Sequence, residues 1–89
     1  MGSFDQAEHY YSREVEINPE DALALYNLAV IKEKLNKPQE AVRYYEQFIA
    51  LKPPAYAAIL PSINAKIALL KAQLRSSRDP AVHRSQAND

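Results

Sequence analysis

The chain has no cysteine and no tryptophan, and its single glycine is Gly2. Without cysteine it can form no disulfide, thiolate nucleophile or sulfur-ligated metal site, and without further glycine it can form no glycine-rich phosphate loop. The lack of cysteine fits a cytoplasmic protein, which is the location we expect. No apolar run approaches the roughly 18 residues that a membrane-spanning helix needs, so we expect no membrane span.

Residues that commonly carry out catalysis are also scarce. His9 and His83 are the only histidines, and they lie too far apart in sequence to bind a metal as a pair one helical turn apart. We expect each to be a solitary surface histidine. Acidic residues are numerous, but helix surfaces and helix N-termini ordinarily carry them. The sequence therefore predicts no catalytic residue, no metal site and no cofactor, and a protein that is not an enzyme.

Charge is balanced over the whole chain but not along it. Residues 1–50 carry five Lys or Arg against nine Asp or Glu, and residues 51–89 carry six against two. The balances of −4 and +4 leave open a basic surface that contacts nucleic acid or another anionic surface. Five of these six basic residues point around a helix rather than along one face; they are Lys66, Lys71, Arg75, Arg78 and Arg84. Solvated surface charge is therefore the expectation, and binding of nucleic acid is the alternative.

What the sequence does contain is an internal repeat with a period of 34 residues. The shift superposes similar residues along the first half of the chain: Ala7 on Ala41, Tyr10 and Tyr11 on Tyr44 and Tyr45, Val15 on Ile49, Ile17 on Leu51, and Pro19 on Pro53. The same shift superposes residues 24–26 on residues 58–60. Two separate stretches thus agree on one period, which is the signature of a repeat architecture.

Local signals divide the chain into helices. Asn18 is a good N-cap with Pro19 in the first helical position, Asn36 can end that helix in the left-handed conformation, and Pro38 can begin the next. These signals leave only short turns between the predicted helices, and short turns make neighbouring helices antiparallel. The sequence therefore predicts an all-α fold without strands, with four helices over residues 4–17, 19–35, 38–51 and about 55–76.

The two ends of the chain are set apart from this domain, which we predict to span residues 4–76. Residues 1–3 are interpreted as a cloning scar and residues 77–89 as a disordered polar tail. Pro61 falls within the last helix, where it either kinks the helix or lies in the first turn of a helix that starts afresh. The predicted apolar stripe of this helix is Ile59, Ile63, Ile67, Leu70 and Leu74, and its opposite side carries Ala58, Ala65, Ala68, Leu69 and Ala72.

Residues 22–55 resemble a tetratricopeptide repeat. The residues that carry the resemblance are Leu25, Leu28, Ala29, Ala41, Tyr45, Phe48 and Pro53. Residues 4–21 resemble the second half of a preceding repeat, and the last helix resembles the closing helix of such arrays. Lys32 and Phe48 depart from the pattern, because the family usually has an aromatic residue and an alanine at these positions. The resemblance implies stacked antiparallel hairpins in a short right-handed α-solenoid that binds other proteins.

The resemblance also implies a concave groove lined by the first helix of each hairpin. By position, its residues are Leu23, Tyr26, Val30, Glu33 and Lys34, with Leu60 and Asn64 from the last helix. Tyr26 and Val30 lie one turn apart and suit an apolar helix or an extended peptide, although both could instead pack against the neighbouring helix. Some members grip a C-terminal carboxylate with basic and amide residues. Only Asn27 matches that set, so we expect no such clamp.

Self-association is the remaining expectation. Repeat arrays normally need about three repeats for stability, and the resemblance covers fewer. We expect contact through Tyr10 and Val15 on the first helix, and through the alanine-rich side of the last helix. The predicted partners are thus a protein or peptide in the groove, together with a second copy in a homodimer or further repeats of a longer parent chain. The predicted function is a non-enzymatic scaffold.

Overall fold

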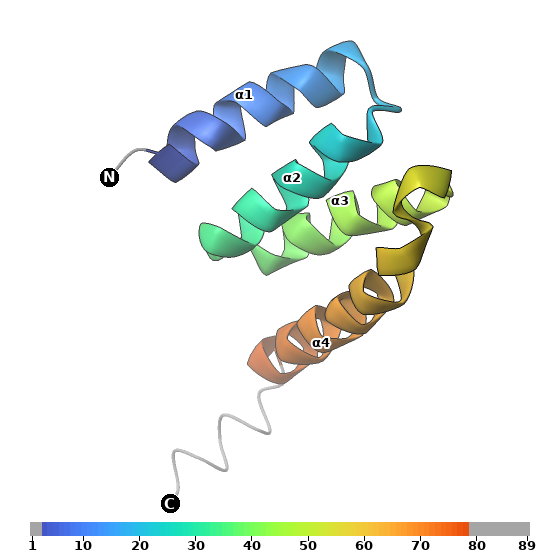
Figure 1. The fold of residues 1–89 in the computed structure, drawn as a ribbon. Coiled ribbons are helices and arrows are strands. Elements are labelled where there is room, and N and C mark those ends of the chain that lie inside the picture. The colour runs from blue at the N-terminus through green and yellow to red at the C-terminus, as the bar shows by residue number, and fades with distance from the viewer. Residues whose placement is uncertain (1–2, 79–89) are drawn as a thin grey trace, which may run out of the picture.

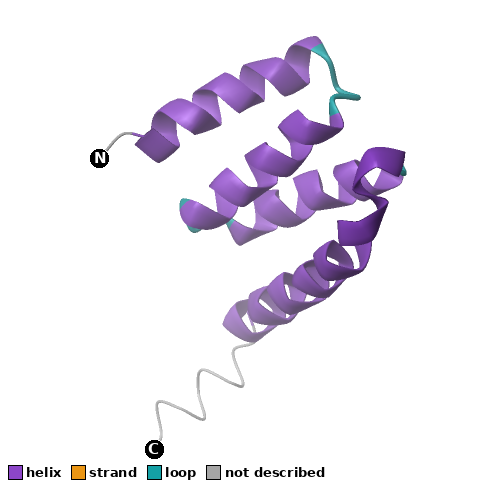
Figure 2. Cartoon of the chain, viewed as in Figure 1, coloured by secondary structure: helices purple, strands orange, loops and turns teal. Residues whose placement is uncertain are grey.

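The computed structural model describes residues 3–78, and within this range it contains four α-helices, one short 3-10 helix and no strand (Figures 1 and 2). The elements are α1 (Ser3–Ile17), α2 (Ala22–Lys34), α3 (Pro38–Ala50), η1 (Pro54–Ile59) and α4 (Leu60–Arg78). Each α-helix runs antiparallel to its predecessor and packs against it, so the chain forms a single row of helices (Figure 1). The predicted all-α fold of stacked hairpins is confirmed.

Helix α2 begins three residues later than predicted. Asn18 does not cap it, because the Asn18 Oδ1 accepts a hydrogen bond from the backbone N–H of Glu20 at 3.2 Å within the turn. Asp21 is the N-cap, and its Oδ1 accepts from the backbone N–H of Ala24 at 3.1 Å. Both residues are good caps. The turn at Pro19 and Glu20 uses the first of them and leaves the second to start the helix.

The end of α2 follows the prediction. Asn36 has a φ of 59°, the left-handed conformation that asparagine tolerates better than most residues. The N–H of Asn36 bonds the carbonyl of Glu33, and the N–H of Lys37 bonds the carbonyl of Lys32, which together make a Schellman motif. Pro38 then begins α3, as predicted, since a proline in the first turn loses no helical hydrogen bond.

The last helix is a new helix that begins at Leu60, and it is not kinked at Pro61. The residues before it form η1, in which Tyr56 leaves helical geometry at φ −117° and ψ 19°. Pro61 is the second residue of α4, where its missing N–H costs no intrahelical bond. Helix α4 extends to Arg78, two residues beyond the predicted end, and residues 79–89 of the predicted tail lie outside the described residues. At the other end, Ser3 of the segment assigned to a cloning scar is the first residue of α1.

The core lies between α2, α3 and α4. Its buried members are Leu25, Ala29, Ala41, Val42, Tyr45, Phe48, Ile63, Ile67 and Leu70. Of the predicted stripe on the last helix, Leu74 is partly buried against this core, while Ile59 lies in η1 and is 37 % exposed. Helix α1 contributes no buried residue. Helix α1 is therefore attached to the surface of a three-helix core.

The α2–α3 hairpin is built around two alanines. Ala29 and Ala41 have 0 % of their surface exposed, and both belong to the core of the two helices. Methyl side chains allow the two backbones to approach closely, and a longer side chain at either position would force them apart. Packing at this crossing therefore requires a small residue at both positions.

Replacing Ala41 with leucine should overpack this crossing and lower the free energy of unfolding by about 1–3 kcal/mol. Urea denaturation followed by circular dichroism would measure the change. Ala50→Leu is the matched control, because Ala50 is exposed on the same helix and has room for the larger side chain. Equal stability of the two variants would show that α2 and α3 do not cross at Ala41.

Candidate functional site

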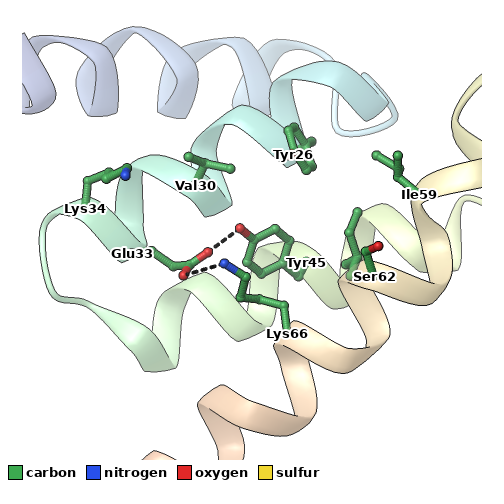
Figure 3. Close-up of a pocket in the computed structure, with 9 residues that line it drawn as sticks. Tyr26, Val30, Glu33, Lys34, Tyr45, Ile59, Ser62 and Lys66 are labelled. Carbon is green, nitrogen blue, oxygen red and sulfur yellow. Dashed lines mark hydrogen bonds and ion pairs between the residues drawn. The ribbon is translucent and has the colours of Figure 1, made fainter.

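A pocket of about 460 Å³ lies between α2 and α4, above the middle of α3 (Figure 3). Its lining residues come from all three helices and from η1: Tyr26, Val30, Glu33, Lys34, Tyr45, Ile59, Ser62, Ile63 and Lys66. The α2 residues form one wall, η1 and α4 form the other, and Tyr45 lies between them (Figure 3). The pocket lies where the family resemblance implied a groove, and it is called the groove below.

One end of the pocket is polar. The Tyr45 hydroxyl donates a hydrogen bond to Glu33 Oε2, and Lys66 Nζ lies 3.3 Å from Glu33 Oε1 (Figure 3). Burial raises the pKa of the Tyr45 hydroxyl well above its usual value, and the Glu33 carboxylate raises it further. Tyr45 therefore remains a neutral donor at all ordinary pH values. Glu33 thus joins Tyr45 of α3 to Lys66 of α4 at this end of the groove.

The rest of the pocket is aromatic and aliphatic. The Tyr26 ring lies 5.6 Å from the Phe48 ring and 6.2 Å from the Tyr45 ring, between centroids. Phe48 in turn lies 5.8 Å from Tyr56. Tyr26 and Val30 are partly buried against the core while they also line the pocket. Each of these two side chains therefore has one side packed against the core and one side open to the pocket.

The structure brings together four of the seven residues predicted to line the groove: Tyr26, Val30, Glu33 and Lys34. Leu23 is exposed on α2 and borders a different pocket. Leu60 is partly buried against the core, and Asn64 is exposed outside the lining of this pocket. The wall opposite α2 is instead made by residues that the sequence analysis did not propose, namely Ile59, Ser62, Ile63 and Lys66.

A second pocket of about 230 Å³ lies between α1 and α2, one repeat before the first. Its lining residues are Tyr10, Tyr11, Glu14, Asp21, Leu23, Ala24 and Asn27. Leu23, Ala24 and Asn27 each precede by 39 positions a residue that lines the first pocket on α4. The two pockets therefore occupy equivalent places in the array, and α2 contributes to both.

This equivalence explains why Leu60 and Asn64 were misplaced. The 34-residue period superposes them on Tyr26 and Val30, and it holds for α1 and α3. Between α2 and α4 the spacing is 39, because η1 adds residues before α4 begins. The resemblance of residues 24–26 to residues 58–60 is therefore not a structural correspondence, and Ala58 and Ile59 belong to η1.

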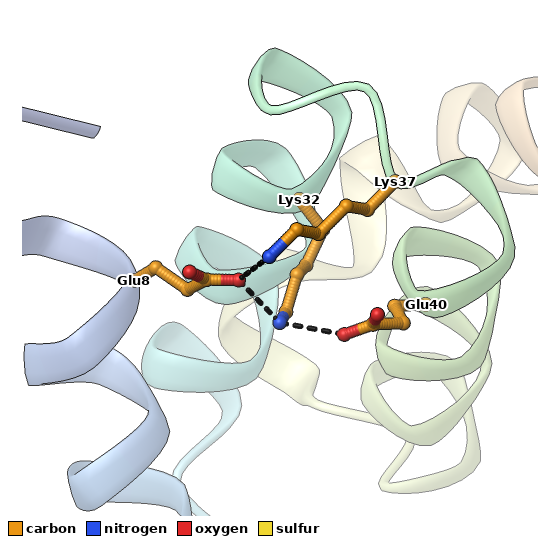
Figure 4. A network of polar contacts seen from close by, with 4 residues as sticks. All are labelled: Glu8, Lys32, Lys37 and Glu40. Carbon is orange, nitrogen blue, oxygen red and sulfur yellow. Dashed lines mark hydrogen bonds and ion pairs between the residues drawn. The ribbon is translucent and has the colours of Figure 1, made fainter. Parts of the chain in front are cut away.

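A second polar cluster joins α1, α2 and α3 (Figure 4). Lys32 is only 7 % exposed, and its Nζ lies 2.5 Å from Glu8 Oε2 on α1 and 2.6 Å from Glu40 Oε1 on α3. Lys37 Nζ lies 2.8 Å from the same Glu8 oxygen. Lys32 stands where the family usually has an aromatic residue. Its aliphatic chain fills part of that space, and its ammonium is neutralised by the two carboxylates.

The charges in this cluster stabilise one another. Hydrogen bonds from Lys32 and then Lys37 lower the pKa of Glu8 below its ordinary value, and a hydrogen bond from Lys32 lowers that of Glu40. Burial alone would lower the pKa of Lys32. The hydrogen bonds to Glu40 and Glu8 outweigh burial, so the pKa of Lys32 is raised. All three groups are therefore charged near neutral pH.

The residues predicted for self-association lie in different environments. Tyr10 is 58 % exposed on α1, whereas Val15 is partly buried against the core and offers little surface to a partner. On α4 the residues Ala65, Ala68, Leu69 and Ala72 are exposed, and Ala58 is exposed in η1.

Two basic residues of α4, Lys66 and Lys71, have acidic partners. Lys66 pairs with Glu33, and Lys71 Nζ lies 2.7 Å from Glu46 Oε2 on α3. Such pairs reduce the positive charge that α4 presents to solvent. In the part of the chain that the structure describes, no group of acidic or histidine side chains has the arrangement of a metal site. Over the same residues, no helix is long and apolar enough to cross a membrane.

Comparison with known proteins gives one match. The family model described as tetratricopeptide repeat matches residues 22–55, the range from the first residue of α2 to the start of η1. No curated protein and no solved structure matches the chain.

The Glu8–Lys32–Glu40 cluster should make stability depend on pH at both extremes. The lowered pKa values of Glu8 and Glu40 contribute stability above about pH 4.5 that is lost as the pH falls through them. The raised pKa of Lys32 contributes stability below about pH 10.5 that is lost as the pH rises through it.

Glu8→Gln should therefore be less stable than the parent chain at pH 7, and the difference in stability should shrink toward pH 3. Glu16→Gln, an exposed change on the same helix, is the control. A Glu8→Gln difference that stays constant with pH would show that the ion pair does not form.

Proposed function

Because residues 22–55 form a tetratricopeptide repeat, and such repeats generally mediate protein–protein interaction, we propose that this chain binds a protein segment in the groove between α2 and α4. The observation that supports this proposal is the combination of open apolar and fixed polar surface in one pocket. Tyr26, Val30, Ile59 and Ile63 offer contacts for an apolar side chain. Aromatic anchors of this kind supply much of the binding free energy at protein interfaces.

The polar end of the groove favours a particular orientation of the bound segment. Glu33 already accepts from Tyr45 and pairs with Lys66, so its charge is largely neutralised. Lys34 and Lys66 then leave the rim with a net positive charge. We propose that the segment places an apolar side chain between α2 and η1 and an acidic or polar group toward these lysines.

We propose that the chain acts as a binding module and not as an enzyme. Tetratricopeptide repeats are typically non-enzymatic. Glu33 is the carboxylate of the pocket, and it is held by two partners instead of facing an open position where a substrate proton could be taken up. His9 is exposed on α1 and is not among the lining residues of either pocket.

The scaffold function includes, in our proposal, self-association of the chain. Tyr10 on α1 and Leu69 on α4 are large apolar side chains that are more than half exposed. Exposed apolar surface of this kind gains free energy on burial, at about 25 cal/mol per Å². Contact of α4 with nucleic acid remains the second candidate, and the ion pairs of Lys66 and Lys71 weaken it.

The groove can be tested with peptides selected from a displayed library by the intact chain and then titrated by calorimetry. Val30→Ser should weaken binding roughly tenfold, and Tyr26→Ala more, because each removes an apolar wall of the pocket. Circular dichroism would verify that each variant is folded. Gln47→Ala, an exposed change on α3 outside the pocket lining, should bind as the parent chain does.

A double replacement of Lys71 and Arg75 separates the two candidate functions. If this variant loses binding while Val30→Ser keeps it, the basic surface of α4 is the binding site. Binding to an anionic surface would also weaken steeply with added salt, whereas binding in an apolar groove would change little.

A further inference from the structure

Helix α1 exposes a face that its counterpart α3 buries. The 34-residue period superposes α1 on α3, so Ala7 corresponds to Ala41 and Tyr11 to Tyr45. Ala41 is completely buried because α2 covers it, but Ala7 is only half-buried. Two large apolar residues follow Ala7 on this side of α1, about one and three helical turns further along. They are Tyr10, 58 % exposed, and Ile17, 74 % exposed.

Helix α4 exposes a face that its counterpart α2 buries. The 39-residue spacing established by the two pockets superposes Ala29 on Ala68, Val30 on Leu69 and Leu25 on Asn64. Ala29 and Leu25 are buried against α3, whereas Ala68 and Asn64 are exposed. Leu69 is 57 % exposed. Among the described residues, no helix covers this face of α4 in the way that α3 covers the matching face of α2.

From these two correspondences we infer that copies of the chain associate head to tail, with α4 of one copy packed against α1 of the next as α2 packs against α3. Ala68 would then meet Ala7 at a close crossing like that of Ala29 and Ala41, and Leu69 would cover the side of the second pocket near Tyr10. This inference rests on the self-association proposed above and specifies its two surfaces.

The charges of the two helices support a second copy as the occupant. Helix α1 carries Asp5, Glu8, Glu14 and Glu16 against Arg13, a net charge of −3. Helix α4 carries four basic residues and no acidic one, a net charge of +4. The two helices lie at opposite edges of the molecule, so they do not neutralise each other within one copy (Figure 1). Glu8, Lys66 and Lys71 are already paired within one copy, so the attraction between copies comes mainly from the other charges of the two helices.

The contact has one unfavourable position. Asn64 stands where Leu25 fills the core of the α2–α3 hairpin, and burial of its amide costs free energy unless it finds a hydrogen-bond partner. The contact between copies is therefore weaker than the hairpin within one copy. It is also heterologous, since a different surface is used on each side. Such contacts add copies in a row and do not stop at a two-fold dimer.

Two variants test the arrangement, each of which blocks one face. Ala68→Arg blocks the α4 face and Tyr10→Arg blocks the α1 face, and both positions are exposed, so the monomer should stay folded. In sedimentation experiments the average mass of the parent chain should rise with concentration to more than twice the monomer mass of 10.1 kDa. Each variant alone should remain a monomer. An equimolar mixture should form a dimer and nothing larger, because only one pair of intact faces remains.

Asn64→Leu should strengthen association about tenfold or more, because it places an apolar side chain where Leu25 packs. Ala50→Arg, on the exposed side of α3, should associate as the parent chain does. If the variants Ala68→Arg and Tyr10→Arg associate like the parent chain, other surfaces are responsible and the head-to-tail arrangement is wrong. If parent chain and Asn64→Leu both remain monomers, self-association itself is wrong. Neither result affects peptide binding in the groove, which Val30→Ser tests separately.

Discussion

The close crossing of α2 and α3 at Ala29 and Ala41 determines the positions of most other features. Because both side chains are single methyl groups without exposed surface, the two backbones come near enough for Tyr45 to reach Glu33. That hydrogen bond holds the carboxylate beside Lys66 and so connects the hairpin to α4. The floor and the polar end of the groove thus depend on the lack of side-chain volume at two positions. The shape of the proposed binding surface is thus set by residues that lie outside the pocket lining.

Lys32 provides a different kind of connection, since it holds α1 against a core to which α1 contributes no buried residue. An aromatic ring at this position would hold α1 only through apolar contact, which would not fix the position of α1 along α2. An ammonium between Glu8 and Glu40 fixes α1 at one point along α2 and α3. Buried ion pairs give little net stability, because desolvation offsets the attraction between the charges, but they can specify one packing arrangement. Register is therefore the main contribution of this cluster.

The helix boundaries set by local chemistry could be predicted from the sequence, and those set by tertiary structure could not. Asn36 and Pro38 have one favourable placement each, and the structure has it. Asn18 and Asp21 are equally good caps, so the start of α2 depended on a turn that local rules do not distinguish.

The same distinction applies to the candidate site. The family resemblance placed four of the pocket-lining residues on α2, whereas the α4 wall was missed because residue similarity concealed the five-residue change of spacing between 34 and 39. The ion pairs of Lys32 join residues 24 positions apart, beyond any local pattern. Contacts of this range become visible only when the helices are in place.

The separation of charge between α1 and α4 has a kinetic consequence. Because α1 is acidic and α4 is basic, the domain has a dipole moment, which the ion pairs of Glu8, Lys66 and Lys71 reduce. A charged partner is turned by this field as it diffuses toward the domain, which can raise the association rate constant by about 10- to 1,000-fold. The field decays over a Debye length of about 10 Å at 0.1 M salt. Ionic strength therefore changes how fast complexes form, while the lifetime of a complex depends on the short-range packing that follows.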